Sequence, residues 1–185
     1  MESLHKTYPE IFFTEESEEN EIGRKEVYAF LRSFTTLSGI QDTESLLKDL
    51  TGIVLEHSGA EKFILIIEKE QKLFIQAIGN INPGEISVNN TPLPENDCHD
   101  TISIPTELIR YVHRTGENII SENLSIDPLF KDTPYIKKFE PRSVMCIKKA
   151  VGDSSFIWYL ENNLLEGAFV DPSKNNIFAV LTDYA

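Results

Sequence analysis

The stretch Lys62-Phe-Ile-Leu-Ile-Ile-Glu68 is followed by Lys69-Glu-Gln71 and then by Lys72-Leu-Phe-Ile-Gln-Ala-Ile78. The first and last of these segments are short apolar runs rich in β-branched residues, which is typical of strands. The polar residues between them predict a turn, because a short charged segment can connect two antiparallel strands. The sequence therefore predicts a β-hairpin over residues 62–78.

A second pair of apolar runs, Ser143-Val-Met-Cys-Ile-Lys148 and Ser155-Phe-Ile-Trp-Tyr-Leu160, predicts another strand pair with a turn at Gly152-Asp153. Side chains alternate between the two faces of a strand, so we expect Trp158 and Tyr159 on opposite faces. Packing of both rings in the core is the favoured interpretation. The alternative is that one of them lines a cavity, where its polar group needs a partner. Shorter strands are expected near residues 85–88 and 118–121.

Helical periodicity marks other parts of the chain, where apolar residues recur at steps of three and four. Helices are expected over residues 24–39, 43–57 and 106–114, and from Asp171 or Ser173 to the end. The chain thus begins with helices, continues with strands, an intervening helix and more strands, and closes with a helix. This order predicts an α+β fold with a mainly antiparallel sheet.

The chain has 185 residues, of which 41% are hydrophobic, and a formal net charge of −13. This length suits one domain, and the apolar content suffices for a core without metals or disulfides. An acidic chain lacks the basic face of a nucleic-acid binder, so we expect no nucleic-acid partner. No apolar run reaches the roughly 20 residues of a membrane span, and only two cysteines are present, so the sequence predicts a cytoplasmic protein without a membrane contact.

The charge is unevenly distributed along the chain. Residues 1–23 contain seven acidic side chains and one basic one, so we expect a flexible tail ahead of one domain over residues 24–185. Residues 131–149 contain six basic and two acidic side chains. A solvated surface is the simplest interpretation of this segment. An anion site or a docking surface for the acidic tail are the alternatives.

The motifs of common catalytic sites are absent from the sequence. It contains neither a phosphate-binding glycine loop nor a nucleophilic serine flanked by glycines. The densest polar cluster, Asp97-Cys98-His99-Asp100, has residue types that suit a metal or a reactive thiol, but neighbours in sequence rarely point at one ion. We therefore expect no catalytic residue and no metal site, and we interpret Cys146 as a buried, inert thiol.

Several longer motifs are similar to those of a known family. The segment Pro105-Thr-Glu-Leu-Ile-Arg-Tyr-Val-His-Arg-Thr-Gly-Glu-Asn-Ile-Ile120, the strand entry Pro141-Arg-Ser-Val144 and the strand exit Tyr159-Leu-Glu-Asn162 resemble, in this order, motifs of GAF domains. They most resemble the subgroup embedded in large multidomain bacterial signalling kinases. The resemblance covers about residues 27–182. It is specific as to family and weak as to ligand.

The resemblance implies a roughly six-stranded antiparallel sheet with helices from both termini on one face. On the other face it implies a small-molecule pocket under loops and a short helix. GAF domains bind cyclic nucleotides, bilins, haem, metal ions or other small effectors, and many dimerise through their terminal helices. By this resemblance, the candidates for the pocket lining are Leu108, Tyr111, Met145, Ile147 and Tyr159.

Three residues depart from the pattern of the subgroup. Lys148 and Lys149 stand where a proline and an apolar residue are usual, and they favour an anionic ligand. Phe156 stands where a glycine is usual, and its ring would fill space that a ligand would use. Lys148 and Phe156 therefore join the pocket candidates. Neither the signature of cyclic-GMP binders nor a bilin cysteine at its usual place is found, so no cofactor is named.

Three functional hypotheses follow. The leading one is a non-catalytic sensory module of signal transduction that binds a small-molecule effector, forms a homodimer and acts on an output kinase or another signalling protein. The alternative is an interaction or dimerisation module with the same fold, whose pocket is closed by Phe156. A remote alternative is a thiol-dependent reductase of free methionine sulfoxide, for which the two cysteines are the only support.

Overall fold

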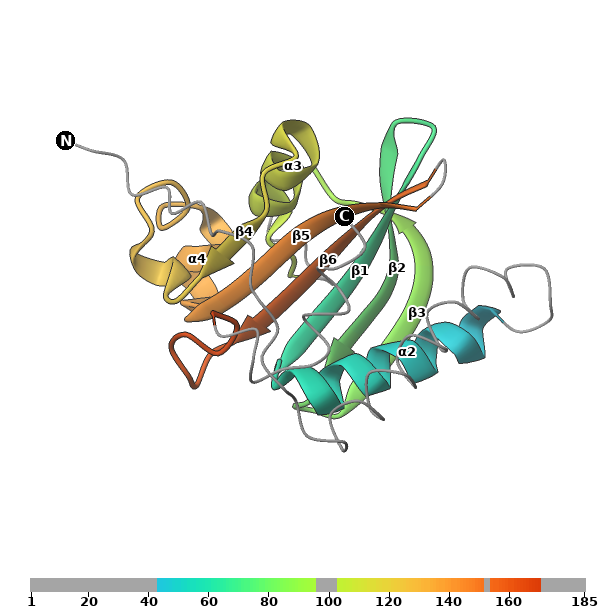
Figure 1. Cartoon of the computed structure of the whole chain (residues 1–185), viewed down its shortest axis with the longest axis horizontal. Helices are drawn as coiled ribbons and strands as arrows, with labels where there is room; N and C mark the ends of the chain where they lie inside the picture. The colour runs from blue at the N-terminus through green and yellow to red at the C-terminus, as the bar shows by residue number, and fades with distance from the viewer. Residues whose placement is uncertain (1–42, 96–102, 152–153, 171–185) are drawn as a thin grey trace, which may run out of the picture.

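The computed structural model describes residues 43–95, 103–151 and 154–170. Its centre is a six-stranded antiparallel sheet in the order β3-β2-β1-β6-β5-β4 (Figure 1). The strands are β1 (Lys62–Lys69), β2 (Lys72–Asn80), β3 (Glu85–Pro92), β4 (Ile119–Ser121), β5 (Ser143–Val151) and β6 (Ser154–Asn162). The helices are α2 (Thr43–Ser58), α3 (Thr106–Thr115), the 3-10 turn η1 (Leu124–Ile126) and α4 (Pro134–Phe139). The predicted α+β class with a six-stranded antiparallel sheet is confirmed.

The two predicted strand pairs form the centre of this sheet. β1 pairs with β2, β5 pairs with β6, and the two pairs join where Lys62 of β1 lies opposite Glu161 of β6. In the turn between β1 and β2, Glu70 and Gln71 have the left-handed φ angles 51° and 61°. Gln76 is an extra residue in β2 relative to β1, and beyond this bulge the side chains of β2 change faces.

Helix α2 covers one face of the sheet, over β1, β2 and β3 (Figure 1). Its buried residues Leu47, Leu50 and Val54 recur at helical spacing, as the sequence pattern predicts. We call this side of the sheet the α2 face. Its buried apolar cluster contains Leu47, Leu50, Val54, Leu55, Ala60, Phe63, Leu65, Ala77, Met145, Ile147, Trp158, Leu160 and Phe169.

Helices α3 and α4 and the turn η1 lie on the opposite side, which we call the α3 face. Helix α3 packs on β5 and β6, and it ends at Gly116, whose left-handed φ of 72° lets its N–H donate to the Val112 carbonyl at 2.9 Å. Helix α4 begins with Pro134, whose missing N–H costs nothing in the first turn. The buried apolar cluster of this face contains Ile64, Ile66, Leu73, Ile75, Ile78, Leu93, Ile104, Leu108, Ile109, Val112, Leu124, Phe130, Tyr135, Ile136, Val144, Cys146, Ile157 and Tyr159.

Most predicted elements inside the described residues are confirmed, with ends that shift by a few residues. The short strand expected at residues 85–88 extends to Pro92. The expected acidic tail, the helix over residues 24–39, the turn at Gly152-Asp153 and the closing helix lie outside the described residues. Among the residues that are described, no helix is both long and apolar enough to cross a membrane.

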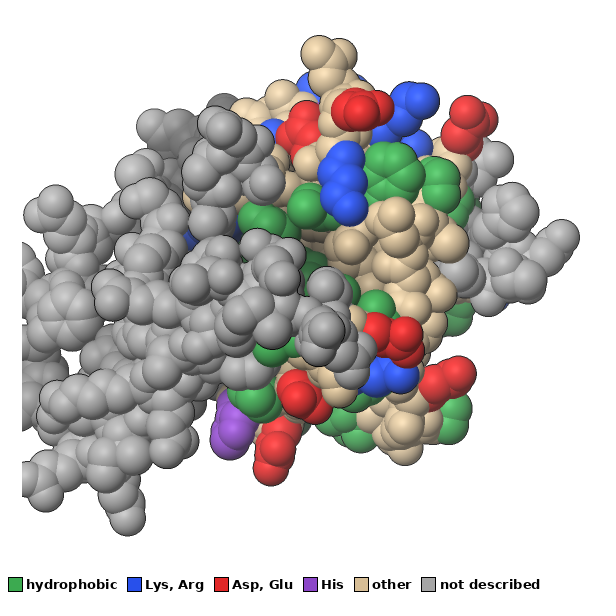
Figure 2. All heavy atoms as spheres, turned by 90° about the vertical axis from the view of Figure 1, so that its right-hand side faces the viewer, with side chains coloured by type: hydrophobic (Ala, Val, Ile, Leu, Met, Phe, Trp, Pro, Cys, Tyr) green, Lys and Arg blue, Asp and Glu red, His purple; other side chains and the backbone are tan. Residues whose placement is uncertain are grey.

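One edge of the sheet is formed by β3, most of whose side chains are exposed or half-buried. This strand contains polar residues such as Ser87, Asn89 and Asn90. The side of the molecule seen in Figure 2 carries acidic and basic side chains interspersed with apolar and other polar ones. Polar edge residues of this kind discourage pairing of the strand with another chain.

Candidate functional site

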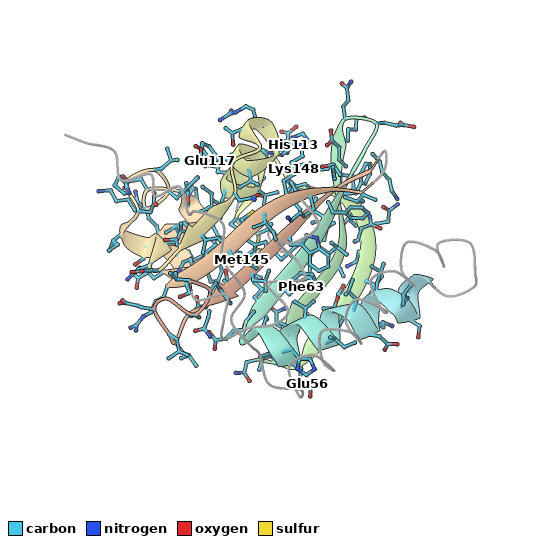
Figure 3. All side chains as sticks on the ribbon, in the orientation of Figure 1. Glu56, Phe63, His113, Glu117, Met145 and Lys148 are labelled. Carbon is cyan, nitrogen blue, oxygen red and sulfur yellow. The ribbon has the colours of Figure 1, made fainter. Side chains whose placement is uncertain are left out.

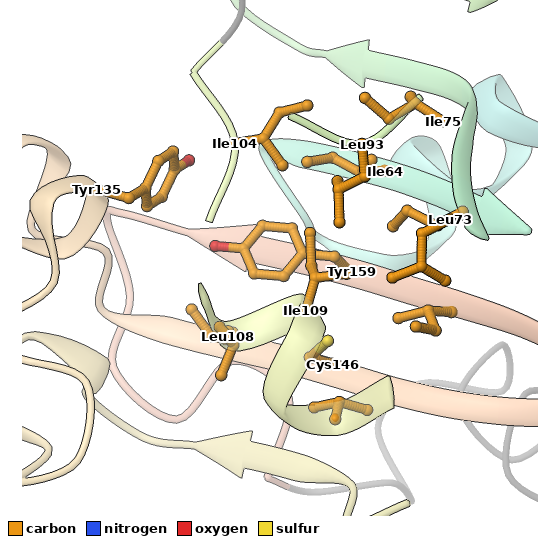
Figure 4. Packing of buried hydrophobic residues seen from close by; sticks show 14 of the residues in the cluster. Ile64, Leu73, Ile75, Leu93, Ile104, Leu108, Ile109, Tyr135, Cys146 and Tyr159 are labelled. Atoms are coloured by element: carbon orange, nitrogen blue, oxygen red, sulfur yellow. The ribbon is translucent and has the colours of Figure 1, made fainter. Parts of the chain in front are cut away.

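Four polar side chains meet among the apolar residues of the α3 face, and we call them the polar cluster: Lys62, Tyr135, Tyr159 and Glu161. Lys62 and Glu161 come from opposite positions on β1 and β6, and Tyr159 lies two residues before Glu161 on the same face. Tyr135 comes from α4. Figure 4 shows the Tyr159 hydroxyl pointing toward the side on which Tyr135 lies.

One carboxylate oxygen organises the polar cluster. The Tyr159 hydroxyl donates to Glu161 Oε2 at 2.5 Å, and the Tyr135 hydroxyl donates to the same oxygen at 2.7 Å. Lys62 Nζ in turn donates to Tyr135 Oη at 2.9 Å and to the Ser103 carbonyl at 3.0 Å. The lysine and the glutamate are therefore linked through the Tyr135 hydroxyl, which accepts from one and donates to the other.

The polar cluster is largely withdrawn from solvent. Both tyrosines are fully buried, and Glu161 is only 4% exposed. Burial lowers the pKa of the Lys62 ammonium, and the negative charge of Glu161 opposes this effect. Burial, and then the neighbouring Glu161, raise the pKa of the Tyr159 hydroxyl well above its usual range. Tyr159 consequently remains a hydrogen-bond donor at neutral pH.

Aromatic rings flank the lysine of the polar cluster. Lys62 Nζ lies 5.0 Å from the centroid of the Tyr135 ring and 5.7 Å from that of Phe139. The two rings are tilted against each other with their centroids 4.7 Å apart. A cation at this position gains from the ring quadrupoles, so α4 contributes both a hydroxyl partner and an aromatic wall.

A second polar group lies at the rim of the α3 face, where α3 ends (Figure 3). His113 Nε2 of α3 lies 3.1 Å from Glu68 Oε2 of β1, and Lys148 Nζ of β5 lies 3.7 Å from the same oxygen. Lys148 Nζ also donates to the His113 carbonyl at 3.1 Å. The His113 imidazole is the main reason that the pKa of the Glu68 carboxyl is lowered. We call Glu68, His113 and Lys148 the rim group.

Solved structures with the same arrangement of strands and helices are GAF domains. The GAF domain of a phosphoenolpyruvate-protein phosphotransferase from Acinetobacter matches with a TM-score of 0.53 and 14% sequence identity, over 86% of this chain and 90% of that one. The GAF domain of a phosphoenolpyruvate-protein phosphotransferase from Coxiella burnetii matches with a TM-score of 0.51 and 17% identity, over 85% and 88% of the two chains. This chain has the GAF fold.

Curated relatives are histidine kinases that are much longer than this chain. Histidine protein kinase 1 of Candida albicans is 26% identical over 123 residues, which are 63% of this chain and 5% of the kinase. Hybrid signal transduction histidine kinase G of Dictyostelium discoideum is 33% identical over 75 residues, which are 40% of this chain and 2% of the kinase. This chain therefore corresponds to a small part of either relative. No family model matches the sequence.

On this GAF fold, three of the seven predicted pocket residues, Leu108, Tyr111 and Tyr159, belong to the apolar cluster of the α3 face or pack against it. Leu108 of α3 is buried in the cluster of that face, and Tyr159 is a member of the polar cluster itself. Tyr111 is partly buried and packs against the apolar cluster of the α3 face, with its ring centroid 5.4 Å from that of Phe130. Its hydroxyl donates to Glu117 at 2.6 Å.

Three other predicted pocket residues lie on the opposite face of the sheet from Tyr159. Met145, Ile147 and Phe156 belong to the α2 face, because Cys146 pairs with Tyr159 and strand neighbours alternate between faces. They cannot line one cavity together with Tyr159. The expectation that Phe156 closes the pocket is likewise wrong, because its ring packs against the α2-side cluster.

The basic segment over residues 131–149 does not gather into one anion site. Lys148 is on the α3 face within the rim group, whereas the adjacent Lys149 is on the α2 face and buried. Lys137 pairs with Asp132 at 3.0 Å, and Arg142 donates to the Leu164 carbonyl at 3.4 Å. Strand alternation and local partners thus separate the basic side chains that the sequence places side by side.

The sequence contains two cysteines, Cys98 and Cys146, and Cys146 lies within the residues that the structure describes. Cys146 is fully buried in β5, and burial raises the pKa of its thiol. This agrees with the expected buried thiol. The segment Asp97-Cys98-His99-Asp100 lies outside the described residues. In the part of the chain that the structure describes, no three His, Cys, Asp or Glu side chains gather as metal ligands would.

Sequence reasoning missed Lys62, Tyr135 and Glu161 as site residues. Lys62 and Glu161 stand at the ends of apolar runs, where a charged residue looks like the solvent-exposed end of a strand. The signal that could have found Glu161 is its even spacing from Ile157 and Tyr159, which places it on the same face as both. Nothing in the sequence connects Tyr135 with either strand.

Proposed function

We propose that this chain is a non-catalytic regulatory GAF module of a signalling protein, and that it binds a small molecule on the α3 face beside the polar cluster. The observation that carries the proposal is the polar cluster itself. It brings an ammonium, a carboxylate and two phenols together between apolar side chains. Convergent polar groups in an apolar surrounding are typical of small-molecule sites.

Stability alone gives a poor account of these four residues. Removing two charges from water costs several kcal/mol per ion, and apolar residues of similar volume often stabilise a core as well or better. A half-buried lysine and a buried glutamate joined through Tyr135 therefore favour a role beyond packing. Recognition of a polar ligand is the role that fits their position under α3 and α4.

The signalling part of the proposal rests on the curated relatives. Both are histidine kinases, and the chain is similar to only a small part of each. We therefore propose that the module transmits ligand occupancy to an output kinase or another signalling protein, and that it acts as a homodimer. Residues 24–185 would form the domain and residues 1–23 a tail.

Native mass spectrometry of the freshly purified chain tests ligand binding and self-association together. We expect a dimer that carries a bound small molecule. Glu161→Gln should lose the molecule, because it removes the charge that the two tyrosines contact. The matched control Glu68→Gln alters a carboxylate of the rim group and should retain the molecule. A chain without any bound molecule, whose melting temperature no candidate effector raises, would contradict the proposal.

A second candidate function is an interaction module that needs no ligand. The observation in its favour is the dense apolar cluster on the α3 face, where Ile104, Ile109 and Val112 are fully buried. This module would dimerise or capture a partner irrespective of small molecules. Sedimentation measurements before and after exhaustive dialysis distinguish the two, because only the ligand-binding module should change its state of association.

A thiol-dependent reductase of free methionine sulfoxide is the third hypothesis, and the burial of Cys146 speaks against that thiol as its nucleophile. A thiolate is the reactive form, and a buried thiol with a raised pKa does not supply it at neutral pH. We expect Cys98→Ser and Cys146→Ser to leave ligand binding and self-association unchanged, although Cys146→Ser should lower stability because it places a hydroxyl among apolar residues. Loss of a methionine sulfoxide reductase activity in either variant would revive the hypothesis.

A further inference from the structure

Lys62 is held without a carboxylate at ion-pair distance among the described residues. Its ammonium donates to a phenol oxygen and to a backbone carbonyl, at 2.9 Å and 3.0 Å. The carboxylate of Glu161 lies one hydroxyl further away, on the other side of Tyr135. Lys62 is half-buried, so part of its side chain is exposed to solvent.

The surroundings of Lys62 favour the neutral amine more than those of an exposed lysine do. Burial penalises the charged form and lowers the pKa of the ammonium, and the remote Glu161 only partly opposes this. Lysines that become nucleophiles in proteins are activated by desolvation of the same kind.

Tyr135 provides a path for the proton that the amine must lose. Its hydroxyl accepts a hydrogen bond from Lys62 Nζ and donates its own proton to Glu161 Oε2. A proton can therefore leave the ammonium for the phenol oxygen while the phenol proton moves to the carboxylate. The reaction proposed below needs this transfer, because the neutral amine is the nucleophile.

We propose that Lys62 is a covalent attachment site for a small ligand with an aldehyde or 2-oxo-acid carbonyl, held as an imine. The neutral amine adds to the carbonyl carbon to form a carbinolamine, and the carbonyl oxygen then leaves as water. The proton stored on Glu161 returns through Tyr135 to the imine nitrogen. The balance is one ammonium and one carbonyl on one side, and one protonated imine and one water on the other.

The aromatic rings near Lys62 suit the product of this reaction. The protonated imine is a cation, as the ammonium was, and the rings of Tyr135 and Phe139 lie about Nζ at 5.0 Å and 5.7 Å. The inference rests on the proposed ligand-binding function and names the chemical class of the ligand.

The test is reductive trapping with glyoxylate and cyanoborohydride at pH 7, followed by peptide mapping. Labelling of Lys62 in the native chain should be several-fold faster than labelling of the exposed Lys48 and Lys72. In urea, where the chain is unfolded, the three lysines should react at equal rates. Tyr135→Phe keeps the ring but removes the hydroxyl, and it should abolish the preference for Lys62. Lys48→Arg is the matched control and should leave the preference intact.

Equal rates for Lys62 and Lys48 in the native chain would overturn the carbonyl site, whatever the variants do. The comparison of native and unfolded wild type needs no variant, so it stands even where Tyr135→Phe does not fold. A ligand found by native mass spectrometry together with equal labelling rates would leave the proposed function in place and remove only the imine. The two failures are therefore distinguishable.

Discussion

Glu68 is the residue at which β1, α3 and β5 meet, since its carboxylate faces both His113 and Lys148. Its pKa is lower in the folded protein than its ordinary value, chiefly because of His113. A carboxyl group of this kind stabilises the fold at pH values above its unfolded pKa. That stabilisation is lost as the pH falls through the folded pKa.

Glu68→Gln should therefore lower the free energy of unfolding at pH 7 by about 0.5 kcal/mol, the size expected for a partly exposed ion pair. The difference from wild type should shrink as the pH falls below 4.5, the ordinary pKa of the group, because wild-type Glu68 then becomes protonated. Urea titrations at several pH values measure this. Glu44→Gln, which breaks the exposed pair with Lys48, is the control and should show a smaller effect. A difference that stays constant into acid would contradict the role of Glu68.

Gly79 is the position at which α2 comes closest to the sheet. A Cβ atom added there would lie 2.4 Å from Thr51 Cγ2 and 2.7 Å from Leu55 Cδ1. Gly79→Ala should consequently destabilise the protein by about 1–3 kcal/mol, the cost of overpacking a core. The measurement is the urea midpoint at constant slope.

Gly52→Ala is the matched control, because it also adds a single methyl group, but on α2 instead of on the sheet. Its Cβ would lie 3.8 Å from Ile86 Cδ1, an ordinary contact, and alanine favours the helix by about 1 kcal/mol over glycine. This variant should be as stable as wild type or more so. Equal destabilisation by both substitutions would show that the close approach at Gly79 is not the cause.

At the scale of elements, the hairpin of β1 and β2 shows what sequence patterns can predict. The β-branched runs on either side of Lys69 to Gln71 determine its two strands. The bulge at Gln76 was not predictable, because it depends on pairing with β3 as well as β1, and Gln76 Nε2 is held by Asn90 Oδ1 of β3 at 2.8 Å. The left-handed pair in the turn has no glycine or asparagine to signal it.

That turn carries removable strain. A non-glycine residue in the left-handed region costs roughly 1–2 kcal/mol, and here two such residues follow each other. Replacing Glu70-Gln71 by Asn-Gly should raise the free energy of unfolding by about 0.5–1 kcal/mol, because this pair suits the turn type while glycine also loosens the unfolded chain. Replacing both by alanine removes the same side chains without relieving the backbone and should not stabilise. Gain of stability in the alanine variant would contradict the explanation.

The relation between β5 and β6 explains why only part of the site could be predicted. Alternation within one strand separates Trp158 from Tyr159, and this expectation is confirmed. Which residues of β5 join Tyr159 depends on the register between the strands, which pairs it with Cys146. A shift of one residue would exchange the faces of Met145 and Cys146. Neither run alone determines this register, so the sequence groups Met145 and Ile147 with Tyr159, from which the structure separates them.

At the scale of the whole molecule, the described residues form two apolar clusters on one sheet, and β1, β2, β5 and β6 contribute to both. We therefore expect the two faces to unfold together rather than in steps. Each face contains a natural probe. Trp158, the single tryptophan, is 8% exposed on the α2 face with its ring 5.3 Å from that of Phe63. Cys146 is buried on the α3 face.

Urea unfolding of Cys98→Ser, in which Cys146 is the single thiol, tests this cooperativity. The red shift of Trp158 fluorescence and the exposure of Cys146 to a thiol reagent should have the same midpoint. Far-ultraviolet circular dichroism provides the third signal and should coincide with both. Separate midpoints for Trp158 and Cys146 would mean that the faces are independent units.

The alternation of β6 also has a consequence for communication across the molecule. Glu161 of the polar cluster and Leu160 of the α2-side cluster are consecutive residues, so one peptide unit separates the polar cluster from the apolar cluster of the opposite face. We expect a ligand that bonds to the Glu161 carboxylate to act on the same stretch of backbone that carries Leu160. The backbone of β6 would then transmit a change from the α3 face to the α2 face without any side chain crossing the sheet.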